Sequence, residues 1–177
     1  MAPNFSINTA NYISEAENIE SLNTVRVSTD VPVLEGGVFS VDVGAYVTPQ
    51  NTENGIQTSV VPAFEAKYKQ TFAKIHAGNS EIDITGFVRY NRIGDANILK
   101  TAGGVKIPIS DKTSIYMDAF YTEKFGNGTN NAGFWVGMGH KINKKLSLWV
   151  EPVQMNFALD GSGKSTTLAN FGLSYSF

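Results

Sequence analysis

Cysteine is absent from this 177-residue sequence, and so is any apolar run long enough for a membrane-spanning helix, which needs about 18 residues. The lack of cysteine excludes disulfides and thiolate metal sites, and with them the small secreted scaffolds that disulfides hold together. Charged residues are sparse at 17%, and 14 basic residues balance 16 acidic ones. Because no basic excess is present, we expect no nucleic-acid partner.

A secretory signal is also missing from the start of the sequence. Met1-Ala2-Pro3-Asn4 has neither a basic n-region nor an apolar h-region. If the protein is exported, we expect this sequence to be its mature form, with Met1 added for expression; a protein that is never exported would look the same here. The length fits one domain over residues 1–177.

The dominant pattern is an alternation of apolar and polar residues with a period of two. Successive side chains of a β-strand point to opposite faces, so each alternating segment predicts a strand with one apolar and one polar face. The most regular segments are 25–33, 39–47, 82–90 and 167–177. Less regular ones lie at 58–77, 98–109, 113–123, 132–142 and 146–157.

The length of these segments separates a membrane barrel from an ordinary sheet. Most have about 10–13 residues, which is enough to cross a bilayer at a tilt. Strands of soluble domains are nearer 5–6 residues. The sequence therefore predicts an all-β fold, a transmembrane antiparallel up-and-down β-barrel of about ten strands, with eight strands as the alternative.

The connections between the segments fall into two kinds. Tight turns are predicted at 34–37, 78–80, 110–112 and 143–145, and they alternate with longer polar stretches at 48–57, 93–97, 124–131 and 158–165. Short turns at one end and longer loops at the other are typical of bacterial outer-membrane barrels. On this interpretation the C-terminus and the tight turns lie in the periplasm.

Residues 1–21 allow two interpretations. Residues 3–11 offer a tenth strand, with Phe5 and Ile7 on one face, followed by an outer loop at 13–21. An even strand number is usual for such barrels and favours this interpretation. Alternatively, Ser14-Glu15-Ala16-Glu17 is a capping box that opens a short helix, which plugs the lumen or lies on the surface.

Two stretches resemble a known family. The C-terminal segment, with Phe171, Leu173, Tyr175 and Phe177 at alternating positions, resembles the assembly signal of outer-membrane barrel proteins. Residues 103–116 resemble a strand–turn–strand unit of small barrels of the outer-membrane protein A, X and W type. The resemblance implies location in the bacterial outer membrane and insertion by the barrel-assembly machinery. It implies no single function, because fold does not determine function.

Aromatic residues are expected near both ends of the strands on the apolar face. Such girdles suit amphipathic rings at the two membrane interfaces. Tyr90, Tyr121 and Phe134 lie near the predicted outer ends, and Phe39, Phe72, Tyr175 and Phe177 near the periplasmic ends.

The polar face places six acidic and six basic residues in the predicted lumen. They are Asp30, Asp42, Glu65, Asp83, Asp118 and Glu151, and Arg26, Lys67, Arg89, Lys100, Lys106 and Lys141. A ten-stranded barrel is narrow, and an isolated buried charge is costly, so we expect these charges to pair and fill the lumen. The alternative is that they line a selective small pore.

No motif in the sequence supports catalysis or a cofactor. Gly161-Ser162-Gly163-Lys164-Ser165-Thr166 is similar to the end of a phosphate-binding loop, but Ala158 stands where that motif needs glycine, and a strand is predicted to follow. His76 and His140 are expected near opposite ends of their strands, whereas zinc needs three or four converging ligands. We therefore expect no enzyme activity, no cofactor and no metal.

The expected function is structural or surface-binding work through the loops 48–57, 124–131 and 158–165, because binding often resides in loops on a rigid scaffold. A narrow channel for ions or small solutes is the first alternative; a barrel enzyme and a soluble all-β virion or structural protein are others. The expected partners are the lipid bilayer, lipopolysaccharide and the assembly machinery. The extracellular ligand cannot be named from the sequence.

Overall fold

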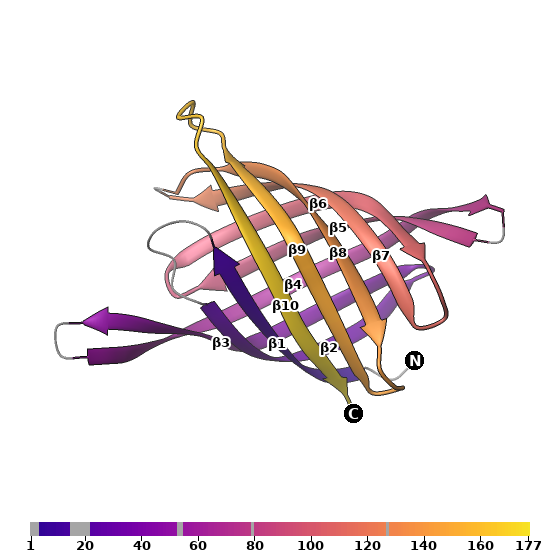
Figure 1. The fold of residues 1–177 in the computed structure, drawn as a ribbon, viewed down its shortest axis with the longest axis horizontal. Helices are drawn as coiled ribbons and strands as arrows, with labels where there is room; N and C mark the ends of the chain where they lie inside the picture. Colours follow the sequence, from indigo (N-terminus) through magenta and orange to yellow (C-terminus); the bar gives the residue numbers. More distant parts are fainter. Residues whose placement is uncertain (1–3, 15–21, 53–54, 79, 127) are drawn as a thin grey trace.

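The described part of the chain forms one closed antiparallel β-sheet of ten strands (Figure 1). This computed structural model describes residues 4–14, 22–52, 55–78, 80–126 and 128–177. The strands are β1 (Asn4–Ser14), β2 (Leu22–Leu34), β3 (Gly37–Thr52), β4 (Gly55–Ala77), β5 (Ser80–Ile93), β6 (Ala96–Pro108), β7 (Thr113–Phe125), β8 (Asn131–Lys141), β9 (Leu146–Ala158) and β10 (Ser165–Ser176).

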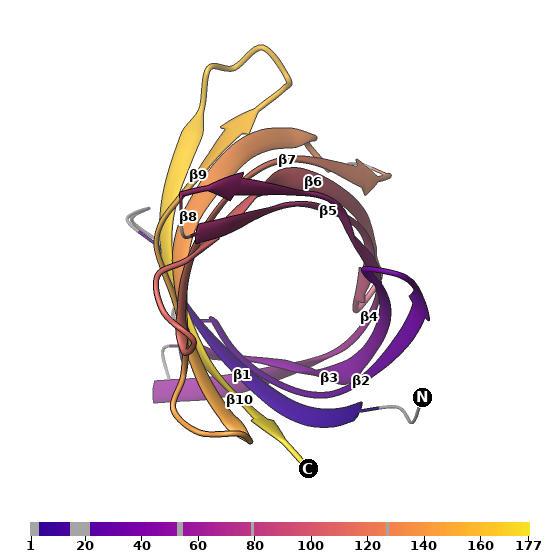
Figure 2. The same cartoon turned by 90° about the vertical axis from the view of Figure 1, so that its right-hand side faces the viewer.

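Each strand pairs with its neighbours in the sequence, and β10 pairs with β1 to close the barrel (Figure 2). In its closed part the sheet has no free edge, so the backbone groups there are satisfied between strands. The predicted up-and-down barrel is confirmed, and the alternative count of eight strands is wrong. Within the described ranges, no helix is long and apolar enough to cross a membrane.

The first strand settles part of the ambiguity at residues 1–21. Strand β1 runs through Ser14 and pairs with both β2 and β10, so the tenth strand exists and is longer than predicted. Residues 15–21, where the outer loop or the short helix was expected, lie outside the described residues. The pairing of Ser6 with Ser176 places the start of β1 and the end of β10 at the same end of the barrel.

The faces of the barrel are inverted relative to a soluble protein. Val25, Val27, Val43 and Val88 are exposed on the outer wall, as the alternation predicted. Among the described side chains, three large apolar ones are buried, Tyr46, Phe120 and Trp135, against ten buried polar or charged ones. Apolar side chains outside and polar ones inside are typical of barrels in lipid, and this distribution argues against the soluble alternative.

Two predicted loops are in fact parts of a hairpin or a tight turn. Strands β3 and β4 stay paired to Thr52 and Gly55, so the segment 48–57 is mostly strand. Only Gly94 and Asp95 separate β5 from β6 where 93–97 was expected to be a longer loop. The polar composition of 48–57 resembles a loop because a strand beyond the apolar band needs no apolar face. The stretches 124–131 and 158–165 do contain connections, at 126–130 and 159–164.

Two hairpins extend beyond the closed part of the barrel, one on each side in Figure 1. Strand β2 pairs with β3 only as far as Val47, and β5 pairs with β4 only as far as Ala63, so the β3–β4 hairpin continues past both neighbours. At the other end, β3 reaches β4 at Gln70 while β4 and β5 continue to Ala77 and Ser80. The 23 residues of β4 make both extensions possible.

A bulge in β9 changes which residues face the lumen. Val136 pairs with Val153 and Met138 pairs with Val150, so β9 has one extra residue next to Pro152. A bulge of this kind suits proline, which cannot donate a backbone hydrogen bond to the ladder. As a result, Glu151 and Gln154 face the lumen together although they differ in parity.

Candidate functional site

The barrel interior holds two adjoining polar cavities. The larger has a volume of about 540 Å³ and the smaller about 400 Å³. Four residues line both of them: Lys67, Arg89, Trp135 and Glu151. Each cavity is large enough for on the order of ten water molecules. The four shared residues therefore form the boundary at which the cavities meet.

The larger cavity contains an ion-pair cluster centred on Glu65. This residue is 4% exposed, and its Oε2 lies 2.7 Å from Arg26 Nη1 and 3.6 Å from Arg89 Nη1. Arg26 also donates to the Tyr46 hydroxyl at 2.5 Å and lies 3.9 Å from Asp42. A buried carboxylate with two guanidinium partners satisfies the requirement that buried charges be paired.

A hydrogen-bond cluster surrounds Glu151 on the opposite wall. The Tyr116 hydroxyl donates to Glu151 Oε1 at 3.0 Å, and Asn170 Nδ2 donates to Oε2 at 3.0 Å. The same Asn170 nitrogen also donates to Gln154 Oε1 at 3.0 Å. The bulge in β9 is what brings Glu151 and Gln154 to one amide group.

Aromatic rings gather around Trp135, which lines both cavities. The Trp135 ring stacks on Phe120, with centroids 4.9 Å apart, and on Phe87 at 6.0 Å. Lys100 Nζ lies 4.0 Å from the Phe120 centroid and 4.8 Å from that of Trp135, which are cation–π distances. The Trp135 indole donates to Asp118 Oδ2 at 2.9 Å. These contacts hold the Trp135 side chain in place at the boundary of the two cavities.

Within the described part of the chain, three lysines of the lumen have no carboxylate partner of the kind that Arg26 and Arg89 have. Among the described residues, no carboxylate oxygen lies within 4.0 Å of the amine of Lys67, Lys69 or Lys106. All three line the smaller cavity. The pairing expected from the sequence thus holds for the arginines, whereas these lysines face the cavity.

The predicted lumen charges are distributed over three places. Arg26, Asp30, Asp42, Glu65, Lys67, Arg89, Lys100 and Glu151 line the larger cavity, and Lys106 and Asp118 the smaller. Lys141 is exposed and lines a third cavity of about 650 Å³ at the end with the short turns. Asp83 lies near that end, 3.9 Å from Lys74 of the projecting β4–β5 hairpin. The interior therefore brings ten of the twelve together and leaves Asp83 and Lys141 near the rim.

Several residues of the lumen were not predicted from the sequence. Lys69 shares the parity of Glu65 and Lys67 in β4, and that parity was the signal that could have identified it. Phe87 and Trp135 stand at polar-face positions, but an apolar ring in a lumen is not expected from alternation. Asn170 and Gln154 could not be linked to Glu151 without the bulge.

The two histidines lie on different strands, His76 on β4 and His140 on β8. His140 Nδ1 lies 2.9 Å from the Thr113 hydroxyl, and His76 pairs in register with Glu81 in the projecting hairpin. Among the described residues, no three His, Asp or Glu side chains are placed to hold a metal ion.

At the end of the barrel opposite the short turns, hydrogen bonds connect the loops 126–130 and 159–164. The Leu159 amide donates to the Asn130 carbonyl at 2.9 Å, and the Thr129 hydroxyl donates to Asp160 at 3.4 Å. Hydrogen bonds from Ser162 lower the pKa of Asp160. The glycine-rich stretch that is similar to a phosphate loop is therefore part of this turn, and strand β10 follows it.

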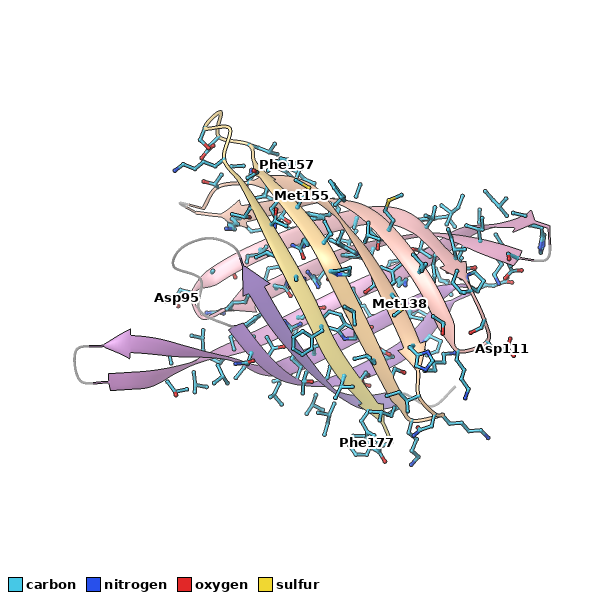
Figure 3. The ribbon with its side chains drawn as sticks, viewed as in Figure 1. Asp95, Asp111, Met138, Met155, Phe157 and Phe177 are labelled. Atoms are coloured by element: carbon cyan, nitrogen blue, oxygen red, sulfur yellow. The ribbon has the colours of Figure 1, made fainter. Side chains whose placement is uncertain are left out.

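The C-terminal residues that resemble an assembly signal lie on the outer wall. Phe171, Leu173, Tyr175 and Phe177 are all exposed, and the rings of Tyr175 and Phe177 meet edge to face at 5.4 Å. Figure 3 shows Phe177 at one end of the barrel and Phe157 at the other. Aromatic side chains thus lie at both ends, although Phe157 is not one of the residues predicted for the girdles.

Comparison with known proteins supports the fold without assigning a family. No protein-family model and no curated protein matches the chain. The structure is similar to that of the KdgM porin, with a TM-score of 0.53 and 11% identity over 97% of this chain and 99% of that one. It is also similar to the translocator domain of the autotransporter NalP from Neisseria meningitidis, with a TM-score of 0.55 and 11% identity over 100% and 89% of the two chains. This chain therefore has the fold of an outer-membrane β-barrel.

Proposed function

We propose that this protein is a narrow channel for ions or small solutes in the bacterial outer membrane. The observation that carries the proposal is the pair of polar cavities that adjoin at Lys67, Arg89, Trp135 and Glu151. A lumen filled by ion pairs would leave no such volumes. The smaller cavity also shares Lys106, Ser114 and Gly139 with the cavity at the short-turn end, so polar space continues to that rim.

The apolar outer wall supports the location. Bilayer lipid and lipopolysaccharide are the partners that such a wall fits, and the exposed C-terminal aromatic residues suit insertion by the barrel-assembly machinery. By the usual orientation of these barrels, the short turns face the periplasm. Membership of the outer-membrane protein A, X and W type remains a prediction, because neither similar structure tests it.

Planar-bilayer recording of the purified, refolded protein tests the channel. We expect small, reproducible openings, because a solute must pass the four side chains at which the cavities meet, Trp135 among them. Trp135→Ala is expected to raise the single-channel conductance, since it removes the ring between the cavities. Val136→Ala, on the lipid-facing side of the same strand, is the matched control and is expected to leave conductance unchanged. A bilayer that stays silent with a natively folded protein contradicts the proposal.

Surface binding through the loops is the second candidate. It is favoured by the hydrogen bonds that join 126–130 to 159–164, because a loop held in one conformation loses less entropy on binding. The segment 48–57, expected earlier to be a third binding loop, contributes a projecting hairpin instead. A protein without channel activity that binds a cell-surface ligand through these loops would favour this candidate.

A further inference from the structure

We propose that the smaller cavity is an anion-binding site that makes the lumen favour small anions over cations. The transport part of this inference rests on the proposed channel function, whereas the binding part does not. The site is the wall formed by Lys67, Lys69, Arg89 and Lys106, together with the polar groups beside them.

The first argument is the balance of charge. Four basic residues line the smaller cavity, and the acidic residues there are Asp118 and Glu151. The larger cavity has four of each sign, Arg26, Lys67, Arg89 and Lys100 against Asp30, Asp42, Glu65 and Glu151. The excess positive charge is therefore confined to the smaller cavity.

The second argument is that protein donors already occupy the acidic groups of that cavity. Trp135 donates to Asp118, while Tyr116 and Asn170 donate to the two oxygens of Glu151. Arg89 is directed to Glu65 at 3.6 Å. Three lysine amines remain that lack a carboxylate within 4.0 Å among the described residues. Their charge is available to a solute.

The third argument comes from strand register. Lys67 stands directly opposite Arg89, and Arg89 directly opposite Lys100, which makes a row of three like charges on β4, β5 and β6. Like charges directly opposite each other destabilise a sheet. Glu65 offsets part of this repulsion through Arg89. Lys67 and Arg89 also line the smaller cavity, whereas Lys100 lines the larger one, so an anion in the smaller cavity would offset the repulsion between Lys67 and Arg89.

The chemistry identifies the ligand as a small anion such as chloride or phosphate. Lysine amines offer charged donors, and the hydroxyls of Thr85 and Ser114 lie in the same wall. A volume of about 400 Å³ admits such an ion with part of its water shell. A cation entering the same space meets four basic residues and only two acidic ones, so the charge of the lining repels it.

Reversal potentials under a KCl gradient test the selectivity. The wild-type protein is expected to give a reversal potential of the sign that chloride permeation produces. The double variant Lys69→Gln with Lys106→Gln is expected to move the reversal potential to zero or to the sign that potassium permeation produces. Lys69→Arg with Lys106→Arg keeps the charge and should retain the chloride sign. The matched control, Lys144→Gln with Lys164→Gln, removes two exposed charges outside both cavities and should change nothing. A potassium sign in the wild type, or no shift in the glutamine variant, overturns the proposal.

Tryptophan quenching tests the site even if no current is seen. Phe replaces Trp149, so that Trp135 alone reports from the boundary of the cavities. Iodide is expected to quench Trp135 several-fold more strongly than caesium in the refolded protein, and the Lys69→Gln and Lys106→Gln pair should remove that preference. Preferential iodide quenching without conductance supports the site and contradicts the channel. Stronger quenching by caesium, or equal quenching by both ions, contradicts the site.

Discussion

At the residue scale, the tightest positions are glycines of the sheet that face the lumen. A Cβ added to Gly44 would stand 2.1 Å from the Val25 carbonyl oxygen, and one added to Gly172 would stand 2.0 Å from that of Thr9. Real Cβ atoms do not approach a carbonyl this closely, so only glycine allows the neighbouring strands to lie as they do. Gly103 faces the other side of its strand, and the nearest atom to its added Cβ is 3.9 Å away.

Gly44→Ala is expected to lower the free energy of unfolding by about 1–3 kcal/mol, because the methyl group must displace a backbone strand. Gly103→Ala is the matched control and is expected to be neutral or slightly stabilising, since it restricts the unfolded chain without a clash. Urea titrations in lipid vesicles, followed by tryptophan fluorescence, measure both. Equal effects of the two substitutions would contradict the close approach at Gly44.

Charge placed on the outer wall tests the direction of the side chains. Val43 is 59% exposed on the lipid side, and Ser174 lines the larger cavity. Val43→Arg is expected to cost about 2–4 kcal/mol if it lies near the bilayer midplane, whereas Ser174→Arg should cost much less. The same urea titration compares them. A larger cost for Ser174→Arg would show that the inner and outer faces are exchanged.

At the element scale, the projecting hairpins are the feature that separates this barrel from the prediction. Strands β3 and β4 continue as a two-stranded ribbon beyond β2 and β5. A two-stranded hairpin alone is marginally stable, so its pairs contribute little to the closed sheet.

Removing residues 49–51 and 56–58 together deletes matched pairs of the β3–β4 hairpin and preserves its register. We expect the free energy of unfolding to change by less than about 0.5 kcal/mol, because these positions pair with neither β2 nor β5. Removing 49–51 alone breaks the register and serves as the destabilised comparison. Heat-modifiable gel migration and urea titration measure the effect. A large loss of stability in the matched deletion would mean that the ribbon packs on the barrel.

The last strand carries the residues that resemble an assembly signal. Phe177 is 68% exposed and contacts Tyr175. Deleting Phe177 is expected to reduce insertion into the outer membrane of cells, while refolding into detergent suffers less, because an assembly signal would act through the assembly machinery and detergent refolding does not use it. Deletion of Met1 is the control at the other terminus. Equal insertion with and without Phe177, measured in outer-membrane fractions, would count against the resemblance.

At the scale of the whole molecule, the apolar outer wall determines how the protein behaves in solution. Exposed valine, leucine and phenylalanine side chains surround a closed sheet whose interior is polar. A continuous apolar exterior of this kind is an aggregation hazard in water and a stable surface in lipid.

The purified protein is therefore expected to need detergent, to give a β-type circular dichroism spectrum and to migrate differently on gels with and without boiling. The gel shift is expected because a closed barrel resists unfolding by detergent until it is heated. Size-exclusion chromatography with and without detergent checks the first expectation. A monodisperse monomer in plain buffer would contradict the membrane barrel.

The alternation of side chains was sufficient to predict the strands, the barrel and most of its interior. Period two follows from strand geometry alone, so Glu65 and Arg26 could be placed in the lumen and Val43 on the outside before any contact was known. The same rule could have indicated Lys69, which was not predicted. Strand length and the even strand number then distinguished a ten-stranded membrane barrel from a soluble sheet.

Only the tertiary structure decided which of these charges meet and where space remains. The register of β4 and β5 places Lys67 directly opposite Arg89. The bulge next to Pro152 brings Glu151 and Gln154 within hydrogen-bond distance of Asn170. Pairing also turned 48–57 from an expected loop into a hairpin. Such relations depend on residues far apart in the chain, and a local pattern contains no information about them. The sequence determined which side of the wall each group occupies; the closed sheet determined its neighbours.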